Sequence, residues 1–126
     1  MENKKVILIT EDEKSLQGAL NDKLVNEGFT VLVAKNGVEG LEISLNKHPD
    51  LILLDLDMPK LNGMEMLREL RKDDWGKSVP VIILTNLPSS DENIHKDITE
   101  LEPTYYLTKI ENGLEKISDK IKERLG

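Results

Sequence analysis

The run Leu51–Pro59, with the sequence LILLDLDMP, decides how the rest of this chain is interpreted. It begins with four aliphatic residues, and a short continuous apolar run between turn residues is typical of a strand buried on both faces. Such a strand belongs in the middle of a parallel sheet that helices cover on both sides. Pro59 then turns the chain away, because proline has no amide donor to continue a ladder. Asp55 is therefore predicted at the carboxyl end of a central strand, where open α/β sheets bind ligands.

Further apolar segments alternate with helical patterns on both sides of this strand. Strands are also predicted at Val6–Thr10, Thr30–Ala34, Val81–Thr85 and Tyr105–Thr108. Helices are predicted where apolar residues recur at helical spacing, within Leu16–Val25, Val38–Leu45, Met64–Leu70, Ile94–Leu101 and Leu114–Leu125. Because right-handed crossovers leave few other arrangements, this alternation predicts an α/β fold with a five-stranded, doubly wound parallel sheet and five helices.

The composition limits the classes of function. A chain of 126 residues is expected to form one domain, residues 1–126, and its net charge of −7 argues against direct binding to nucleic acid. The absence of cysteine excludes disulfides, thiol catalysis and cysteine-ligated zinc. No apolar run has the length of a membrane span or of a signal peptide core, so we expect a cytoplasmic protein without membrane contact.

Polar residues follow the predicted strands at their carboxyl ends. Glu11 and Asp12, then Asp55, Thr85 and Lys109 come at four of these ends. Each has a local explanation, such as a helix cap or a solvated strand end. Together, however, three crowded carboxylates repel one another unless a cation intervenes, and Mg²⁺ is the hard cation that prefers oxygen ligands. The lysine ammonium and the threonine hydroxyl suit phosphoryl oxygens. The set therefore predicts a site that holds a phosphoryl group on or beside Asp55.

Four motifs, in this order and spacing, resemble the receiver domain of two-component response regulators over essentially the whole chain. They are Val6–Glu13 (VILITEDE), Pro49–Gly63 (PDLILLDLDMPKLNG), Val79–Thr85 (VPVIILT) and Tyr106–Lys109 (YLTK). The resemblance implies a flavodoxin-like or CheY-like sheet with strand order 2-1-3-4-5. It also implies phosphorelay signal transduction with Mg²⁺ as the cofactor.

The resemblance assigns the chemistry of the acidic residues. Asp55 resembles the phospho-accepting aspartate, whose carboxylate attacks the phosphoryl group of a phosphohistidine or of a small donor such as acetyl phosphate. Glu11 and Asp12 resemble the acidic pocket that binds Mg²⁺ together with Asp55, and Asp57 holds the place whose backbone carbonyl completes the metal site. A protein of this kind catalyses only its own phosphorylation and dephosphorylation, so it is not expected to be an enzyme in the usual sense.

The resemblance also implies a conformational switch and partners. Thr85 and Lys109 occupy the phosphoryl-sensing positions, and Tyr106 occupies that of the aromatic switch residue. Phosphorylation would then change the face formed by the fourth helix, the last strand and the last helix. The implied partners are a sensor histidine kinase or phosphotransfer protein, a downstream protein, and a second copy of the chain at that face.

Two departures from the family pattern leave an alternative open. Asn86 stands where receivers usually have a small residue, and Ile110 stands where they usually have proline, so a docking module that does not depend on phosphorylation is the alternative. Asp55–Asp57 also resembles the nucleophile motif of haloacid-dehalogenase-type phosphohydrolases, but those have threonine or valine where this chain has Met58. A flavodoxin-type flavin binder shares the sheet, but the acidic Glu11–Glu13 repels an unshielded phosphate.

Overall fold

Five parallel strands form one sheet in the computed structural model, which describes residues 4–55, 63–85, 105–108 and 113–125. The sheet order is β2-β1-β3-β4-β5, which confirms the predicted order. The strands are β1 (Val6–Thr10), β2 (Thr30–Ala34), β3 (Leu51–Asp55), β4 (Val81–Thr85) and β5 (Tyr105–Thr108). The described helices are α1 (Lys14–Asn26), α2 (Gly37–Lys47), α3 (Gly63–Lys72) and α5 (Leu114–Leu125). The helix predicted within Ile94–Leu101 lies outside the described residues.

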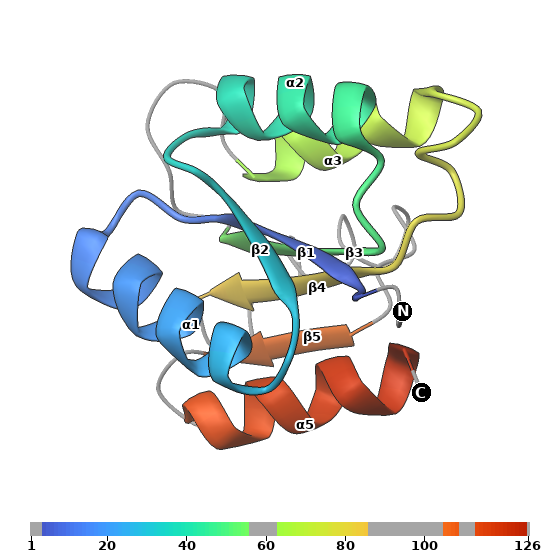
Figure 1. The fold of residues 1–126 in the computed structure, drawn as a ribbon. Coiled ribbons are helices and arrows are strands. Elements are labelled where there is room, and N and C mark those ends of the chain that lie inside the picture. The colour runs from blue at the N-terminus through green and yellow to red at the C-terminus, as the bar shows by residue number, and fades with distance from the viewer. Residues whose placement is uncertain (1–3, 56–62, 86–104, 109–112, 126) are drawn as a thin grey trace.

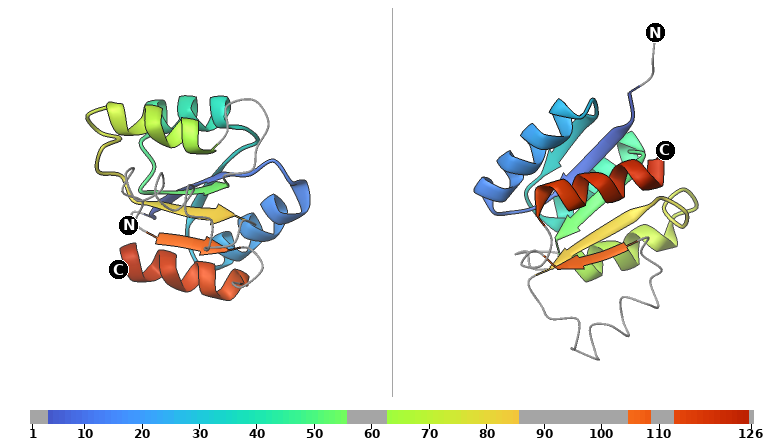
Figure 2. Two further views of the ribbon diagram at one scale, coloured as in Figure 1. Left: turned by 180° about the vertical axis from the view of Figure 1, so that it is seen from behind. Right: turned by 90° about the horizontal axis from the view of Figure 1, so that it is seen from below.

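The helices cover both faces of the sheet. Helices α2 and α3 lie on one face, and α1 and α5 lie on the other (Figures 1 and 2). Side chains of β3 alternate between the two cores: Ile52 and Leu54 pack on the α2/α3 side, whereas Leu51 and Leu53 pack on the α1/α5 side. All four are fully buried, which confirms the prediction of a central strand buried on both faces. None of the helices that the structure describes has the length and hydropathy of a transmembrane span.

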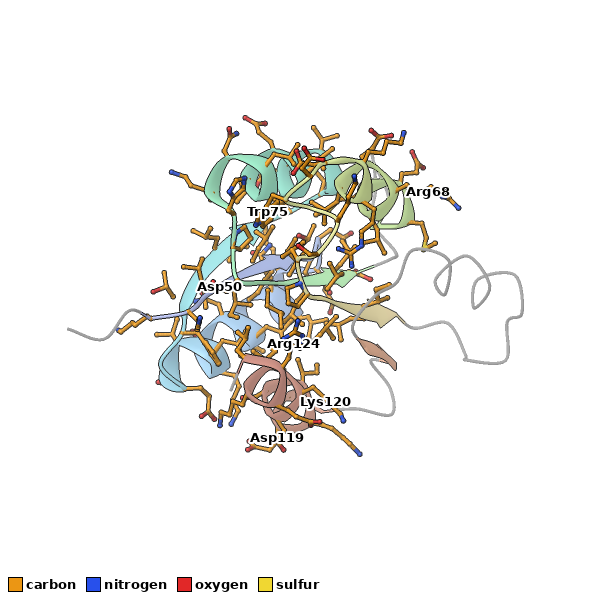
Figure 3. All side chains as sticks on the ribbon, turned by 90° about the vertical axis from the view of Figure 1, so that its right-hand side faces the viewer. Asp50, Arg68, Trp75, Asp119, Lys120 and Arg124 are labelled. Carbon is orange, nitrogen blue, oxygen red and sulfur yellow. The ribbon has the colours of Figure 1, made fainter. Side chains whose placement is uncertain are left out.

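The parallel strands give the sheet two unlike edges, an amino edge where the strands begin and a carboxyl edge where they end. At the amino edge, Asp50 joins β3 to β1, because its carboxylate Oδ2 accepts from the Val6 N–H (2.7 Å) and its own N–H donates to the Val6 carbonyl (2.8 Å). Figure 3 views the molecule from this side, with Asp50 and Trp75 labelled. The aligned strands bring the polar residues at their carboxyl ends to the opposite edge.

Helix α2 contacts the sheet through small residues as well as through Leu41 and Ile43, which pack against the core. Gly37, Gly40 and Ser44 are buried, and a Cβ at Gly40 would lie only 2.8 Å from the Cγ2 atom of Thr10 in β1. Val38 and Leu45 consequently face outward and are 53% and 38% exposed. Apolar spacing identified this helix, but it did not identify the small residues that lie deepest against the sheet.

A cluster of opposite charges joins α1 and α5. The Lys23 ammonium contacts the carboxylates of Glu27 and Glu115, and the Lys122 ammonium contacts Glu27. The pKa of Lys23 is raised by its hydrogen bonds, with the bond to Glu115 having the larger effect and the bond to Glu27 the smaller. The pKa of Glu27 is lowered by the hydrogen bonds that it accepts, with the bond from Lys122 having the larger effect and the bond from Lys23 the smaller. The two helices therefore share an electrostatic contact that depends on pH.

The Lys122→Ala variant should return the pKa of Glu27 toward its ordinary value, because the largest stabilising hydrogen bond to the carboxylate is lost. Because the pKa of Glu27 is lower in the folded protein than in the unfolded chain, the ionised carboxylate stabilises the fold at pH values above the unfolded pKa of about 4.5. This stabilisation is lost as the pH falls through the folded-state pKa. Carbon-detected NMR titration of the Glu27 side chain measures the change. Lys120→Ala is the matched control, since Lys120 pairs with Glu123; an equal shift of Glu27 in both variants would contradict this assignment.

Candidate functional site

Three carboxylates meet at the carboxyl edge of the sheet. Glu11 and Asp12 follow β1, and Asp55 is the last residue of β3. The two strands are neighbours with Thr10 opposite Leu54, so the backbone register brings the next residues of both strands together. One carboxylate oxygen from each of the three acids lies within 4.8 Å of the other two. The juxtaposition that the sequence predicted for these three residues is therefore present.

The three acids differ in their exposure to water. Glu11 and Asp55 are 1% and 2% exposed, whereas Asp12 is exposed. Buried carboxylates close to one another favour any arrangement that brings a positive charge between them. The ligand atoms are all hard oxygen donors, and the exposed side at Asp12 leaves room for water ligands. This donor set fits Mg²⁺, which usually binds one or two carboxylates and keeps several waters.

The turn that carries the first two acids is held by one hydrogen bond of its own and by hydrogen bonds to β2 and α1. The Glu11 N–H donates to the carbonyl of Ala34 in β2 (3.0 Å), which extends the ladder by one residue beyond β1. The Glu11 carboxylate Oε2 accepts from the Glu13 N–H (3.1 Å), and the Glu11 carbonyl accepts from Nε2 of Gln17 in α1 (2.8 Å). Asp12 sits between these fixed residues. Sequence reasoning missed Gln17, because a polar residue in the first turn of a helix is not a signal by itself.

The other predicted site residues are placed only in part. Thr85 ends β4, one strand away from Asp55, and pairs in register with Thr108 of β5. Tyr106 lies in β5 opposite Ile83, two residues before the position of Thr85. The backbone thus brings Thr85 to the same edge as the acids. Four residues discussed above lie outside the described residues, so their roles stay predictions: Asp57, Asn86, Lys109 and Ile110.

His48 lies away from this site. It ends α2 in the left-handed conformation (φ 47°), and its ring stacks on Trp75 with centroids 4.3 Å apart and planes inclined by 14°. Trp75 itself packs against the core on the α2/α3 side of the sheet. The histidine therefore contributes to packing at the amino edge of the sheet. His95 lies outside the described residues.

Comparison with known sequences gives a consistent result. A sequence model of the family described as "Response regulator receiver domain" matches residues 7–122. The chain is 35% identical over 88 residues to "Response regulator MprA" of Mycobacterium sp. (strain KMS), an alignment that covers 70% of this chain and 37% of that protein. It is 43% identical over 88 residues to "Probable transcriptional regulator ycf27" of Porphyra purpurea, covering 69% and 35%. The alignments thus span little more than a third of these relatives.

Comparison with solved structures agrees. The fold matches a CheY-like response regulator receiver domain protein from Methanospirillum hungatei JF-1 with a TM-score of 0.86 and 26% identity, covering 98% of this chain and 94% of that one. It also matches the chemotaxis protein CheY4 of Vibrio cholerae with a TM-score of 0.86, covering 96% and 98%. The identity to CheY4 is 22%, so this second likeness concerns the fold alone.

Proposed function

The chain belongs to the family of response regulator receiver domains, and on this basis we propose that it accepts a phosphoryl group on Asp55 with the help of Mg²⁺. The observation that carries the proposal is the meeting of Glu11, Asp12 and Asp55 within 4.8 Å at the carboxyl edge. Receiver domains are signalling modules rather than conventional enzymes. A chemistry limited to its own phosphorylation and dephosphorylation is part of the proposal, as is a single receiver domain over residues 1–126.

Each acid has a distinct task in the proposed reaction. A carboxylate oxygen of Asp55 attacks phosphorus in line with the leaving group; the new P–O bond forms as the bond from phosphorus to the donor's nitrogen or oxygen breaks. Glu11 and Asp12 hold the cation, and Mg²⁺ neutralises charge on the phosphoryl oxygens when it is bound. Burial of Asp55 limits the water that competes for the new acyl phosphate. The backbone carbonyl of Asp57, the hydroxyl of Thr85 and the ammonium of Lys109 complete the proposed site.

The proposed partners follow from the family and from the charge of the chain. The phosphoryl donor is a sensor histidine kinase or phosphotransfer protein, and the net charge of −7 favours protein partners over nucleic acid. Thr85 and Tyr106, on adjacent strands, form the proposed switch. The proposed output surface is the face of β5, α5 and the predicted fourth helix, where a downstream protein or a second copy of the chain binds. A cytoplasmic location belongs to the same proposal.

A phosphorylation assay tests the function directly. The protein is incubated with acetyl phosphate in the presence and absence of Mg²⁺, and intact mass spectrometry then detects any added phosphoryl group. We expect one added group with Mg²⁺ and far less when a chelator removes the cation. A docking module that does not depend on phosphorylation would gain no phosphoryl group in either condition.

The Asp12→Ala variant should bind Mg²⁺ more than about tenfold more weakly, because even loss of a residue that only supports a metal ligand costs roughly 10–100-fold in affinity. Titration with Mg²⁺ followed by amide NMR measures the dissociation constant. Asp22→Ala is a matched control, since Asp22 is an exposed acid of α1 outside the cluster. Equal affinity of Asp12→Ala and the unmodified protein would remove Asp12 from the metal site.

A further inference from the structure

Among the described residues, Gln17 is the residue of α1 whose side chain forms a hydrogen bond to the turn that carries the acids. Its Nε2 donates to the Glu11 carbonyl (2.8 Å), and its backbone N–H donates to the Glu13 carbonyl (2.9 Å). Gln17 therefore binds both ends of the turn Glu11–Glu13, and Asp12 lies in the middle. A residue that fixes both ends of a three-residue turn also restricts the position of the residue between them.

The turn needs such a restraint because its like charges lie close together and repel. Glu11 and Asp12 are consecutive carboxylates, and both approach Asp55 to within 4.8 Å. Like charges at this distance repel, and the repulsion is strong where burial lowers the effective dielectric. Without a cation, the repulsion favours movement of the exposed Asp12 away from the two buried acids. The hydrogen bonds of the turn oppose this movement.

Of the hydrogen bonds that hold the turn, the bond from Gln17 joins it to a helix through a side chain. The Glu11 N–H is held by β2, through Ala34, and the Glu11 carboxylate is held within the turn by the Glu13 N–H. The Glu11 carbonyl lies beyond the end of β1 and accepts from Nε2 of Gln17. Loss of this amide donor would free the carbonyl side of Glu11 while the β2 contact remains. The turn would then relax at Asp12 rather than at β1.

We propose that Gln17 is a positioning residue that holds Glu11 and Asp12 in the arrangement that binds a divalent cation. This inference rests on the proposed function, since it assumes that the acidic cluster takes Mg²⁺. Gln17 touches neither the cation nor the phosphoryl group in this proposal. It acts through the Glu11 carbonyl, in the way that residues behind metal ligands orient the ligands themselves. Its effect should therefore appear in cation affinity before it appears in fold stability.

The test compares Mg²⁺ affinity in three full-length proteins: unmodified, Gln17→Met and Asn46→Leu. Methionine keeps the length of glutamine but has no amide donor. Asn46 is the matched control because its side-chain amide also donates to a backbone carbonyl, that of Glu42 (2.9 Å), on the exposed surface of α2. Amide NMR titration with MgCl₂ gives the dissociation constants, and urea denaturation in Mg²⁺-free buffer gives the stability of each protein.

We expect Gln17→Met to bind Mg²⁺ about tenfold more weakly than the unmodified protein, in line with the usual effect of residues behind metal ligands. Asn46→Leu should bind Mg²⁺ unchanged, although both variants lose one hydrogen bond of the same kind. In Mg²⁺-free buffer, Gln17→Met should shift the Glu13 amide resonance, because the Glu13 N–H and the Glu11 carboxylate that it binds both belong to the turn that relaxes.

Three outcomes would overturn the inference, and they are distinguishable. If the unmodified protein does not bind Mg²⁺, the proposed metal site fails, and the role of Gln17 fails with it. If the unmodified protein and Gln17→Met bind equally, the metal site stands and Gln17 has no positioning role. If Gln17→Met and Asn46→Leu are weakened equally, the effect is one of general stability rather than of position.

Discussion

Asp55→Asn should take up no phosphoryl group from acetyl phosphate, whereas the unmodified protein should gain one. The amide nitrogen and oxygen of asparagine are poor nucleophiles, so the step that forms the P–O bond is lost rather than slowed. The substitution keeps the size of the side chain, which lies 2% exposed at the end of β3, so the fold should persist. Intact mass spectrometry after incubation with the donor and Mg²⁺ measures the result.

Asp50→Asn is the matched control for this substitution, because Asp50 lies one residue before the other end of the same strand. Its side-chain oxygen accepts from the Val6 N–H, and asparagine retains an oxygen that can accept this bond. Asp50→Asn should therefore be phosphorylated like the unmodified protein. A phosphoryl group still carried by Asp55→Asn would show that another residue is the acceptor.

Asp55→Asn should also change the stability of the fold in the absence of Mg²⁺. Asparagine removes one of three negative charges that lie within 4.8 Å, so the repulsion with Glu11 and Asp12 decreases. We expect Asp55→Asn to unfold at a higher urea concentration than the unmodified protein in Mg²⁺-free buffer. Added Mg²⁺ should reduce this difference in stability, because the cation binds the intact carboxylate and so stabilises the unmodified protein more than it stabilises Asp55→Asn.

Gly76→Ala should destabilise the fold by about 3 kcal/mol or more, a large fraction of the roughly 5–15 kcal/mol that stabilises a typical domain. A Cβ at Gly76 would lie 2.0 Å from the backbone carbonyl oxygen of Leu70, so the backbone itself would have to move. The connection cannot move freely. The Gly76 N–H donates to Asp73 (3.0 Å), and Nη1 of Arg71 donates to the carbonyls of Gly76 (2.7 Å) and Val79 (2.9 Å).

Gly18→Ala is the control for this prediction, with the opposite expected sign. Gly18 lies within α1, and nothing lies within 4 Å of a Cβ placed there. Alanine at an exposed helical position is favoured over glycine by about 1 kcal/mol, so Gly18→Ala should stabilise the protein. Urea denaturation followed by far-ultraviolet circular dichroism measures both variants. An unchanged urea midpoint for Gly76→Ala would contradict this prediction, because it would show that the backbone between α3 and β4 can move to accept the methyl group.

The strands were predictable from the sequence because their signal is local. All five strands have the predicted bounds, since buried parallel strands are short apolar runs limited by turn residues. The helices were predicted as elements, but apolar spacing did not identify all of their buried residues. Val25 belongs to the apolar pattern of α1, yet it is 52% exposed, because the fully buried Leu24 beside it points about 100° away around the helix.

The acidic part of the site was predictable for a related reason. Parallel strands end at one edge, so residues that follow two neighbouring strands meet there whatever the details of packing. The approach of Glu11, Asp12 and Asp55 follows from this rule alone. The contact of Gln17 with Glu11 and the close approach at Gly76 depend on how helices and connections pack in three dimensions. No spacing in the sequence marks either residue.

The stack of His48 on Trp75 has a consequence for optical experiments. Trp75 is the chain's single tryptophan, and it lies between α3 and β4 at the edge opposite to the acids. Its fluorescence should therefore follow global unfolding and respond little to events at Asp55. Fluorescence titrations of events at the acids therefore need a tryptophan added near the carboxyl edge.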